Sequence, residues 1–150
     1  MTGKNQDAAS INKQTVTRFM ALFCAQKLDE AFTLIAPDAV WTLWGNSPAA
    51  RDYSPAQMKE LLAQSWTWFD GPVVWEPTLL VAEDDRVAVI ARSKGTTLSG
   101  YVHQNHYHNL FRLSQGRIVH VREMFPEPPV QRLFEHLQNQ ITADAGTQER

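Results

Sequence analysis

Four polar side chains in the last third of the sequence have the types and spacing needed to move protons. Asn105, Tyr107 and Asn109 alternate along a stretch rich in strand-forming residues, and Glu123 lies in the next such stretch. A poorly solvated carboxylate can act as an acid or base near neutral pH, and a phenol can donate a hydrogen bond to a substrate oxygen. The pattern predicts acid–base chemistry, with Glu123 and Tyr107 as catalytic residues and the two asparagines as substrate-binding residues.

Residues 105–125 must form a hairpin for these groups to meet. Ser114-Gln115-Gly116 is a turn signal, and a three-residue loop with Gly116 in the left-handed conformation places Tyr107 opposite Glu123. Both side chains then point to the face that also carries the apolar residues, which is the face expected to be buried. The other pairs predicted on this face are Asn109 with Val121 and Asn105 with Phe125.

A different turn would change this arrangement, because a shift of one residue moves every side chain of a strand to the opposite face. His106 and His108 would then lie beside Glu123. In the favoured register His106, His108 and His120 share the other face of the hairpin, where a three-histidine metal site is geometrically possible. Solvated or interface histidines are the favoured interpretation, so neither a metal nor a cofactor is expected.

The elements that position the hairpin can be read from hydrophobic spacing. Val16, Phe19, Met20 and Phe23 recur at the helical spacing i, i+3, i+4, i+7. Proline, glycine and acidic clusters divide the rest of the chain. The predicted elements are helices at 11–25, 28–36 and from Ser54-Pro55, strands at 39–44, 73–82 and 86–93, the hairpin, and a closing helix around 130–137.

This order places helices first and consecutive antiparallel strands later, which is typical of an α+β domain with helices packed on one face of a bent sheet. A single domain is expected at residues 10–138. Residues 1–9 and 139–150 are polar or weakly patterned and are expected to be a flexible N-terminus and a flexible tail.

The composition narrows the classes of partner. The 150 residues carry a formal net charge of -2, which provides no basic field for nucleic acid or an anionic membrane. No apolar run is long enough to span a membrane or serve as a signal peptide. The single cysteine, Cys24, excludes an intrachain disulfide. A cytoplasmic protein without a nucleic-acid or membrane partner is expected.

Three segments together resemble the SnoaL-like, ketosteroid-isomerase-like group of proteins. They are residues 17–45, the pattern Asn105-x-Tyr107-x-Asn109-x-Phe111, and residues 116–125. The resemblance implies the nuclear transport factor two fold, a cone-shaped curved antiparallel β-sheet wrapped by three N-terminal helices and a short C-terminal helix. It also implies a ligand cavity inside the cone and a homodimer formed through the outer face of the sheet.

The resemblance assigns the cavity wall and the central carboxylate. Members with limonene-epoxide-hydrolase-like sites carry a catalytic aspartate in an Arg-Asp-aromatic stretch, and Glu123 occupies the matching place. The residues implied to bind substrate around Glu123 and Tyr107 are Met20, Phe23, Trp41, Leu43, Asn105, Asn109, Val121 and Phe125.

The sequence departs from the best-defined chemistries of this group. Ala91 and Ser93 stand where the epoxide hydrolases carry arginine and aspartate, and Leu43 stands near the general base of the ketosteroid isomerases. The expected function is therefore that of a cofactor-independent lyase, dehydratase, isomerase or cyclase acting on a hydrophobic, aromatic or polycyclic molecule. The alternative is a non-catalytic module for small-molecule binding or dimerisation.

Overall fold

The computed structural model describes the backbone of residues 2–148 and the side chains of residues 7–146. The elements, in chain order, are α1 (Thr2–Cys24), α2 (Leu28–Phe32), β1 (Ile35–Trp44), β2 (Asp52–Tyr53), α3 (Pro55–Trp66), β3 (Val74–Glu83), β4 (Arg86–Thr96), β5 (Val102–Ser114), β6 (Arg117–Met124) and α4 (Glu127–Gln148).

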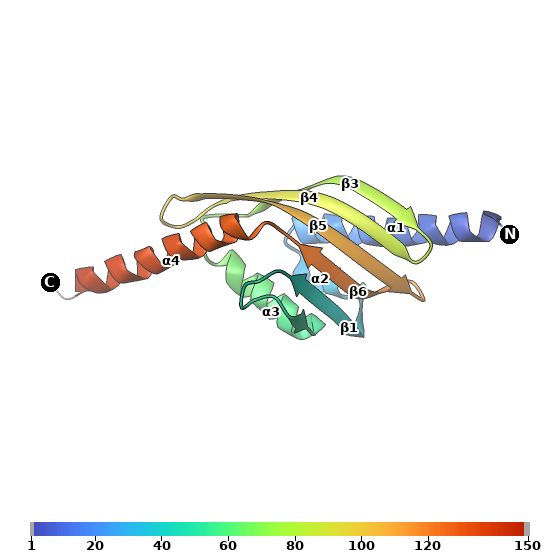
Figure 1. Cartoon of the computed structure of the whole chain (residues 1–150), viewed down its shortest axis with the longest axis horizontal. Helices are drawn as coiled ribbons and strands as arrows, with labels where there is room; N and C mark the ends of the chain where they lie inside the picture. Colours follow the sequence, from blue (N-terminus) through green and yellow to red (C-terminus); the bar gives the residue numbers. More distant parts are fainter. Residues whose placement is uncertain (1, 149–150) are drawn as a thin grey trace.

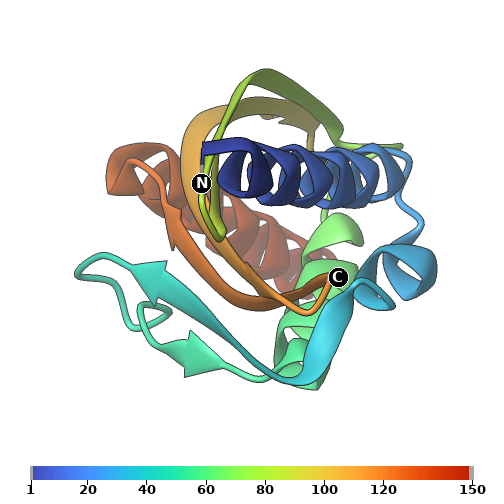
Figure 2. The same cartoon turned by 90° about the vertical axis from the view of Figure 1, so that its right-hand side faces the viewer.

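The six strands form one curved sheet in the order β2-β1-β6-β5-β4-β3 (Figure 1). Strands β3 to β6 are joined by consecutive antiparallel connections, as expected, but β1 pairs with β6 in parallel. The sheet is therefore mixed, which corrects the expected antiparallel sheet. It bends into an unclosed cone, and α1, α2 and α3 lie along its open side (Figure 2).

Local signals account for several element boundaries. Ser54 caps α3 by accepting a hydrogen bond from the backbone amide of Gln57, whose side chain bonds back to the Ser54 amide. Pro77 lies on β3, at the edge of the sheet and next to a shift in its pairing with β4, where a missing amide proton is tolerated. The Ser54 cap agrees with the helix start predicted at Ser54-Pro55.

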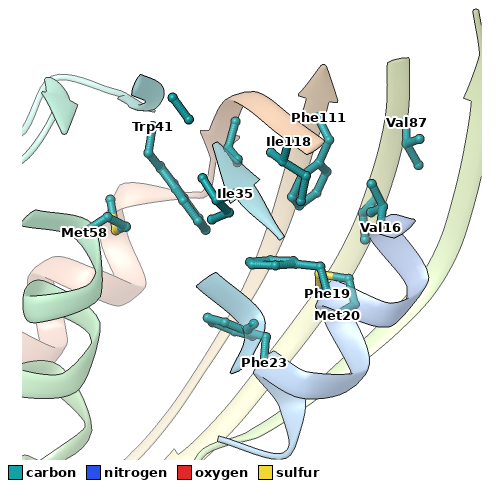
Figure 3. Packing of buried hydrophobic residues seen from close by; sticks show 14 of the residues in the cluster. Val16, Phe19, Met20, Phe23, Ile35, Trp41, Met58, Val87, Phe111 and Ile118 are labelled. Atoms are coloured by element: carbon teal, nitrogen blue, oxygen red, sulfur yellow. The ribbon is translucent and has the colours of Figure 1, made fainter. Parts of the chain in front are cut away.

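The core lies between α1 and the concave face of the sheet (Figure 3). Val16, Phe19, Met20 and Phe23 are all buried, as the helical spacing predicts. The Phe19 ring meets Phe111 of β5 edge-on, with 5.6 Å between ring centroids. Phe19 also contacts Trp41 of β1, so aromatic packing holds α1 against both β1 and β5.

Three helix boundaries differ from the sequence prediction. Helix α2 ends at Phe32 instead of residue 36, because Ile35 and Pro37-Asp38 already belong to β1. Helix α4 has 22 residues and corrects the expected short closing helix. Residues 2–9 and 139–148, expected as flexible ends, continue α1 and α4, and Met1 and residues 149–150 lie outside the described residues. Flexibility of these ends stays a prediction.

The register of the hairpin is also corrected. The loop has two residues, Gln115 and Gly116, both with positive φ (51° and 76°), so Ser114 pairs with Arg117. A further shift in pairing follows between Leu113 and Arg112. As a result Glu123 lies opposite Asn109 instead of Tyr107.

Among the described residues, no helix has both the length and the apolar character required to cross a membrane. The cytoplasmic location stays a prediction.

Candidate active site

Glu123 lies on β6 between two residues of neighbouring strands, Leu43 of β1 and Asn109 of β5. Its carboxylate accepts a hydrogen bond from the indole nitrogen of Trp41, with 2.9 Å between Trp41 Nε1 and Glu123 Oε2. Trp41 is 4% exposed and stacks on Phe32. The parallel pairing of β1 with β6 thus brings a fixed indole donor to the carboxylate, although the two residues are 82 positions apart.

Burial raises the pKa of Glu123 to about 7, and the hydrogen bond from Trp41 partly opposes that rise. The Glu123 side chain lines a cavity and is only partly exposed, so water reaches its carboxyl group poorly. Near neutral pH the two protonation states are therefore similarly populated. A carboxyl group in that condition can both take and return a proton during one reaction.

The carboxyl group borders a cavity of about 170 Å³ that lies between α3, α4 and the concave face of the sheet. Its wall is almost entirely apolar. The cavity shares Ala49, Phe125, Val130 and Phe134 with an outer vestibule of about 620 Å³, so these four residues form its mouth. Glu127, at the start of α4, accepts hydrogen bonds from the backbone amides of Asn46 and Ser47. These bonds link α4 to the loop between β1 and β2 at the rim of the vestibule.

A second, inner pocket of about 20 Å³ lies on the α1 side of Glu123. That volume is sufficient for one water molecule. Among residues 7–146, the side-chain oxygen of Asn109 and the indole nitrogen of Trp75 are buried without a hydrogen-bond partner, and both residues line this pocket with Glu123.

Tyr107 lines the main cavity and is 8% exposed. Its hydroxyl oxygen accepts a hydrogen bond from Ser93 Oγ at 3.2 Å, and its ring lies against Trp75 with 4.4 Å between centroids. Burial is the main cause of a raised pKa of Tyr107, and the Glu123 charge acts in the same direction. The phenol is therefore neutral near pH 7 and is a hydrogen-bond donor.

The other residues predicted from the sequence fall into three groups. Leu43 and Phe125 line the main cavity, whereas Met20, Phe23, Trp41 and Asn109 line the inner pocket. Asn105 and Val121 line neither. Asn105 Nδ2 donates to the Pro126 carbonyl at 3.3 Å and so fixes the connection from β6 to α4.

Several cavity residues were not predicted as site residues from the sequence: Trp66, Trp68, Trp75, Ser93 and His103. The alternation that identified Asn105 and Tyr107 also points to His103, but the strand was expected to begin later. Ser93 continues the inward series of β4 after Ala91 and is a polar residue where an apolar one is usual. The three tryptophans carry no positional signal that separates cavity from core.

The remaining histidines of the hairpin lie on the outer face of the sheet. His106 and His108 are exposed, and His120 Nε2 is 3.0 Å from Thr42 Oγ1. Within the described part of the chain, no three histidine, cysteine or acidic side chains come together as a metal site would require.

The fold and pocket define a cone-shaped α+β domain of the NTF2-like type. The profile of the SnoaL-like domain matches residues 16–121, and the chain belongs to this family. It is a family of small-molecule-binding or catalytic proteins. None of the curated proteins matches the sequence significantly.

Solved structures share the fold at low sequence identity. PrhC from Penicillium brasilianum has 12% identity and a TM-score of 0.80, covering 91% of this chain and 93% of PrhC. TerC, crystallised with polyporic acid, has 20% identity and a TM-score of 0.71, covering 83% and 98%. An NTF2-like protein from Burkholderia thailandensis has 21% identity and a TM-score of 0.73, covering 82% and 96%.

Proposed function

We propose that the protein is a cofactor-independent acid–base enzyme that moves protons on a hydrophobic, aromatic small molecule. The observation that carries the proposal is the Glu123 carboxyl group, which borders an apolar cavity and has a pKa of about 7. In this proposal Glu123 removes a proton from the substrate and returns it at another atom or to a leaving group. Tyr107 donates a hydrogen bond to the substrate oxygen on which negative charge develops.

The cavity volume limits the size of the substrate. A dry apolar cavity of about 150 Å³ holds a benzene-sized molecule. The 170 Å³ cavity therefore suits one ring or two small fused rings, and a larger polycyclic molecule would extend through the mouth into the vestibule. TerC, with the same fold, was crystallised with polyporic acid, which supports a small organic ligand for a protein of this fold.

A carbon-acid probe tests the proposal without knowledge of the natural substrate. Nitrobenzisoxazole is a bicyclic aromatic molecule, and removal of its ring C–H proton by a base breaks the N–O bond and releases a coloured cyanophenolate. We expect the protein to accelerate this ring opening with saturation kinetics, because the probe fits the cavity beside a base. A rate equal to that in buffer, with the probe shown to bind, would contradict the proposal.

The second candidate function is non-catalytic binding of a hydrophobic metabolite. It is supported by Ala91 and Ser93, which stand on the cavity side of β4 where epoxide hydrolases of this fold have charged catalytic residues. Native mass spectrometry of freshly purified protein can reveal a retained molecule. Recovery of that molecule unchanged after incubation in D₂O, without exchange of carbon-bound protons, would favour binding alone.

We also propose a homodimer formed through the outer face of the sheet. Trp44, Leu79, Val81 and Met124 are each about half exposed and line one shallow groove, here called the outer-face patch. Apolar groups gathered in this way usually meet a partner.

Substituting Leu79→Lys together with Val81→Lys should convert the dimer to a monomer, because the two ammonium groups would be buried at the contact. Light scattering at micromolar concentration measures the change. Ile141→Lys on α4, where Ile141 is 70% exposed, is the matched control and should leave the dimer intact. A wild-type monomer, or dissociation caused by the control, would exclude pairing through this face.

A further inference from the structure

Trp41 is packed tightly behind the Glu123 carboxyl group. Its side chain is 4% exposed. The indole stacks on Phe32 of α2, with 6.1 Å between ring centroids and 6° between the ring planes, and it packs against Phe19 of α1 at 6.2 Å. Trp41 lines the inner pocket and does not line the main cavity. It therefore acts on a molecule in the main cavity only through Glu123.

The two oxygens of the Glu123 carboxyl group have different surroundings. Oε2 accepts the hydrogen bond from Trp41 Nε1, and Oε1 has no hydrogen-bond partner within residues 7–146. The buried side-chain atoms of that range that lack both a partner and accessible surface belong to Trp75, His103 and Asn109, so Oε1 keeps accessible surface. The inner pocket, at about 20 Å³, is too small for a ring, so a ring compound reaches Oε1 only from the main cavity.

The indole donor gives the two oxygens separate roles. An indole N–H donates a hydrogen bond and cannot accept one. In the protonated carboxyl group the better acceptor is the carbonyl oxygen, so the oxygen bound to Trp41 is the carbonyl oxygen and the acidic proton lies on Oε1. In the ionised group Oε1 is the oxygen without a donor, and it is the stronger base of the two.

No second charge competes with Trp41 at this carboxyl group. The flanking side chains on the neighbouring strands, Leu43 and Asn109, are uncharged. Among the described residues that line either pocket, only Tyr107 and His103 can ionise besides Glu123. Burial raises the pKa of Tyr107 and lowers the pKa of His103, so both side chains are neutral near pH 7.

We propose that Trp41 is a positioning residue, which binds Oε2 of Glu123 and leaves Oε1 as the oxygen that takes the substrate proton. This inference rests on the proposed function. The substrate C–H bond breaks, its electron pair stays on the substrate, and the proton forms a bond to Oε1. Trp41 remains bonded to Oε2 throughout, so the carboxyl group does not rotate between taking the proton and returning it.

NMR of ¹⁵N-labelled wild-type protein tests the contact without turnover. The indole N–H signal of Trp41 should move with a midpoint near pH 7, because the charge on its acceptor changes when Glu123 ionises. In Glu123→Gln the same signal should not titrate. A Trp41 signal that stays constant between about pH 5 and pH 9 in the wild type would overturn the inference.

Trp41→Phe keeps an aromatic ring and removes the N–H donor. The midpoint of the pH profile of nitrobenzisoxazole ring opening should rise by about one to two pH units, the usual worth of a hydrogen bond to a charged group. The KM of the probe should be unchanged, because Trp41 does not line the main cavity. Trp44→Phe, the same substitution at a half-exposed position of β1, is the matched control and should leave the midpoint in place.

An unchanged or lower midpoint in Trp41→Phe would also overturn the inference. Its failure is distinct from failure of the acid–base proposal. Absence of ring opening in the wild type would contradict the acid–base proposal, whereas ring opening that depends on Glu123, without titration of the Trp41 signal, would overturn this inference alone.

Discussion

Replacing Glu123 by glutamine is expected to reduce the ring opening of nitrobenzisoxazole by about 10²–10⁴-fold, the usual worth of a general base. Glutamine keeps the shape of the side chain and can still accept the hydrogen bond from Trp41. It cannot take a proton, so the fall in rate reports the loss of the base and not a change in side-chain packing. Initial rates under saturating and subsaturating probe should both fall, because the base acts on the transition state.

The pH profile gives an independent check of the same residue. Burial raises the pKa of Glu123 to about 7. The ionised fraction of Glu123, and with it the rate of ring opening, should therefore fall about tenfold per pH unit below that value and level off above it. Glu76→Gln, on the exposed edge strand, is the control and should follow the wild-type profile. A Glu123→Gln variant with wild-type rates would remove the mechanism, and a midpoint near pH 4 would assign the base to an ordinary exposed carboxylate.

The second large effect concerns stability. As the pH rises, the free energy of unfolding of Glu123→Gln should increase relative to that of the wild type. The folded-state pKa of about 7 lies above the ordinary value of 4.5, so the folded protein favours the protonated carboxyl group. Wild-type stability from this group is full below the unfolded pKa and is lost as pH rises through the folded pKa. The total loss is about 3 kcal/mol, at about 1.4 kcal/mol per pKa unit. Glutamine does not titrate and escapes this loss.

Urea unfolding of both proteins at about pH 4, pH 6 and pH 8 measures the difference in free energy of unfolding. The difference should shift by about 3 kcal/mol in favour of the variant across this range, whatever its constant offset at low pH. Glu76→Gln should show no comparable shift. A difference that stays constant with pH would mean that the Glu123 carboxyl group is well solvated in the folded protein.

The two predictions describe one property of the site. The same desolvation that destabilises the folded protein at high pH gives the carboxylate its basicity near neutral pH. A site selected for packing alone would gain from an apolar residue or an amide at this position. A loss of folding stability when Glu123 ionises is therefore expected if this carboxyl group serves a function.

The sequence predicted the face of Glu123 correctly, although its register was wrong. The two-residue loop moves the pairing by one position relative to the expected three-residue loop, which alone would turn Glu123 to the other face. The shift in pairing near Arg112 moves it by one more position and restores the orientation. Neither departure has a clear signal in the residues, since Gln115 is an unusual residue for a positive φ.

Features governed by neighbours in the chain were thus predictable from the sequence. Alternation along β5 and β6 determined that Glu123, Tyr107 and Phe111 share an inward face, and the Ser54-Pro55 pair determined the start of α3. These depend on local backbone geometry and on the separation of apolar from polar groups, which any fold of the chain must respect.

Only the tertiary structure decided the partners of the site. The parallel pairing of β1 with β6 gives Glu123 its Trp41 donor, and the packing of α3 and α4 over the sheet encloses the cavity and buries His103. Such contacts join residues far apart in the chain, and their choice depends on the balance of packing over the whole core, which no short stretch of sequence contains.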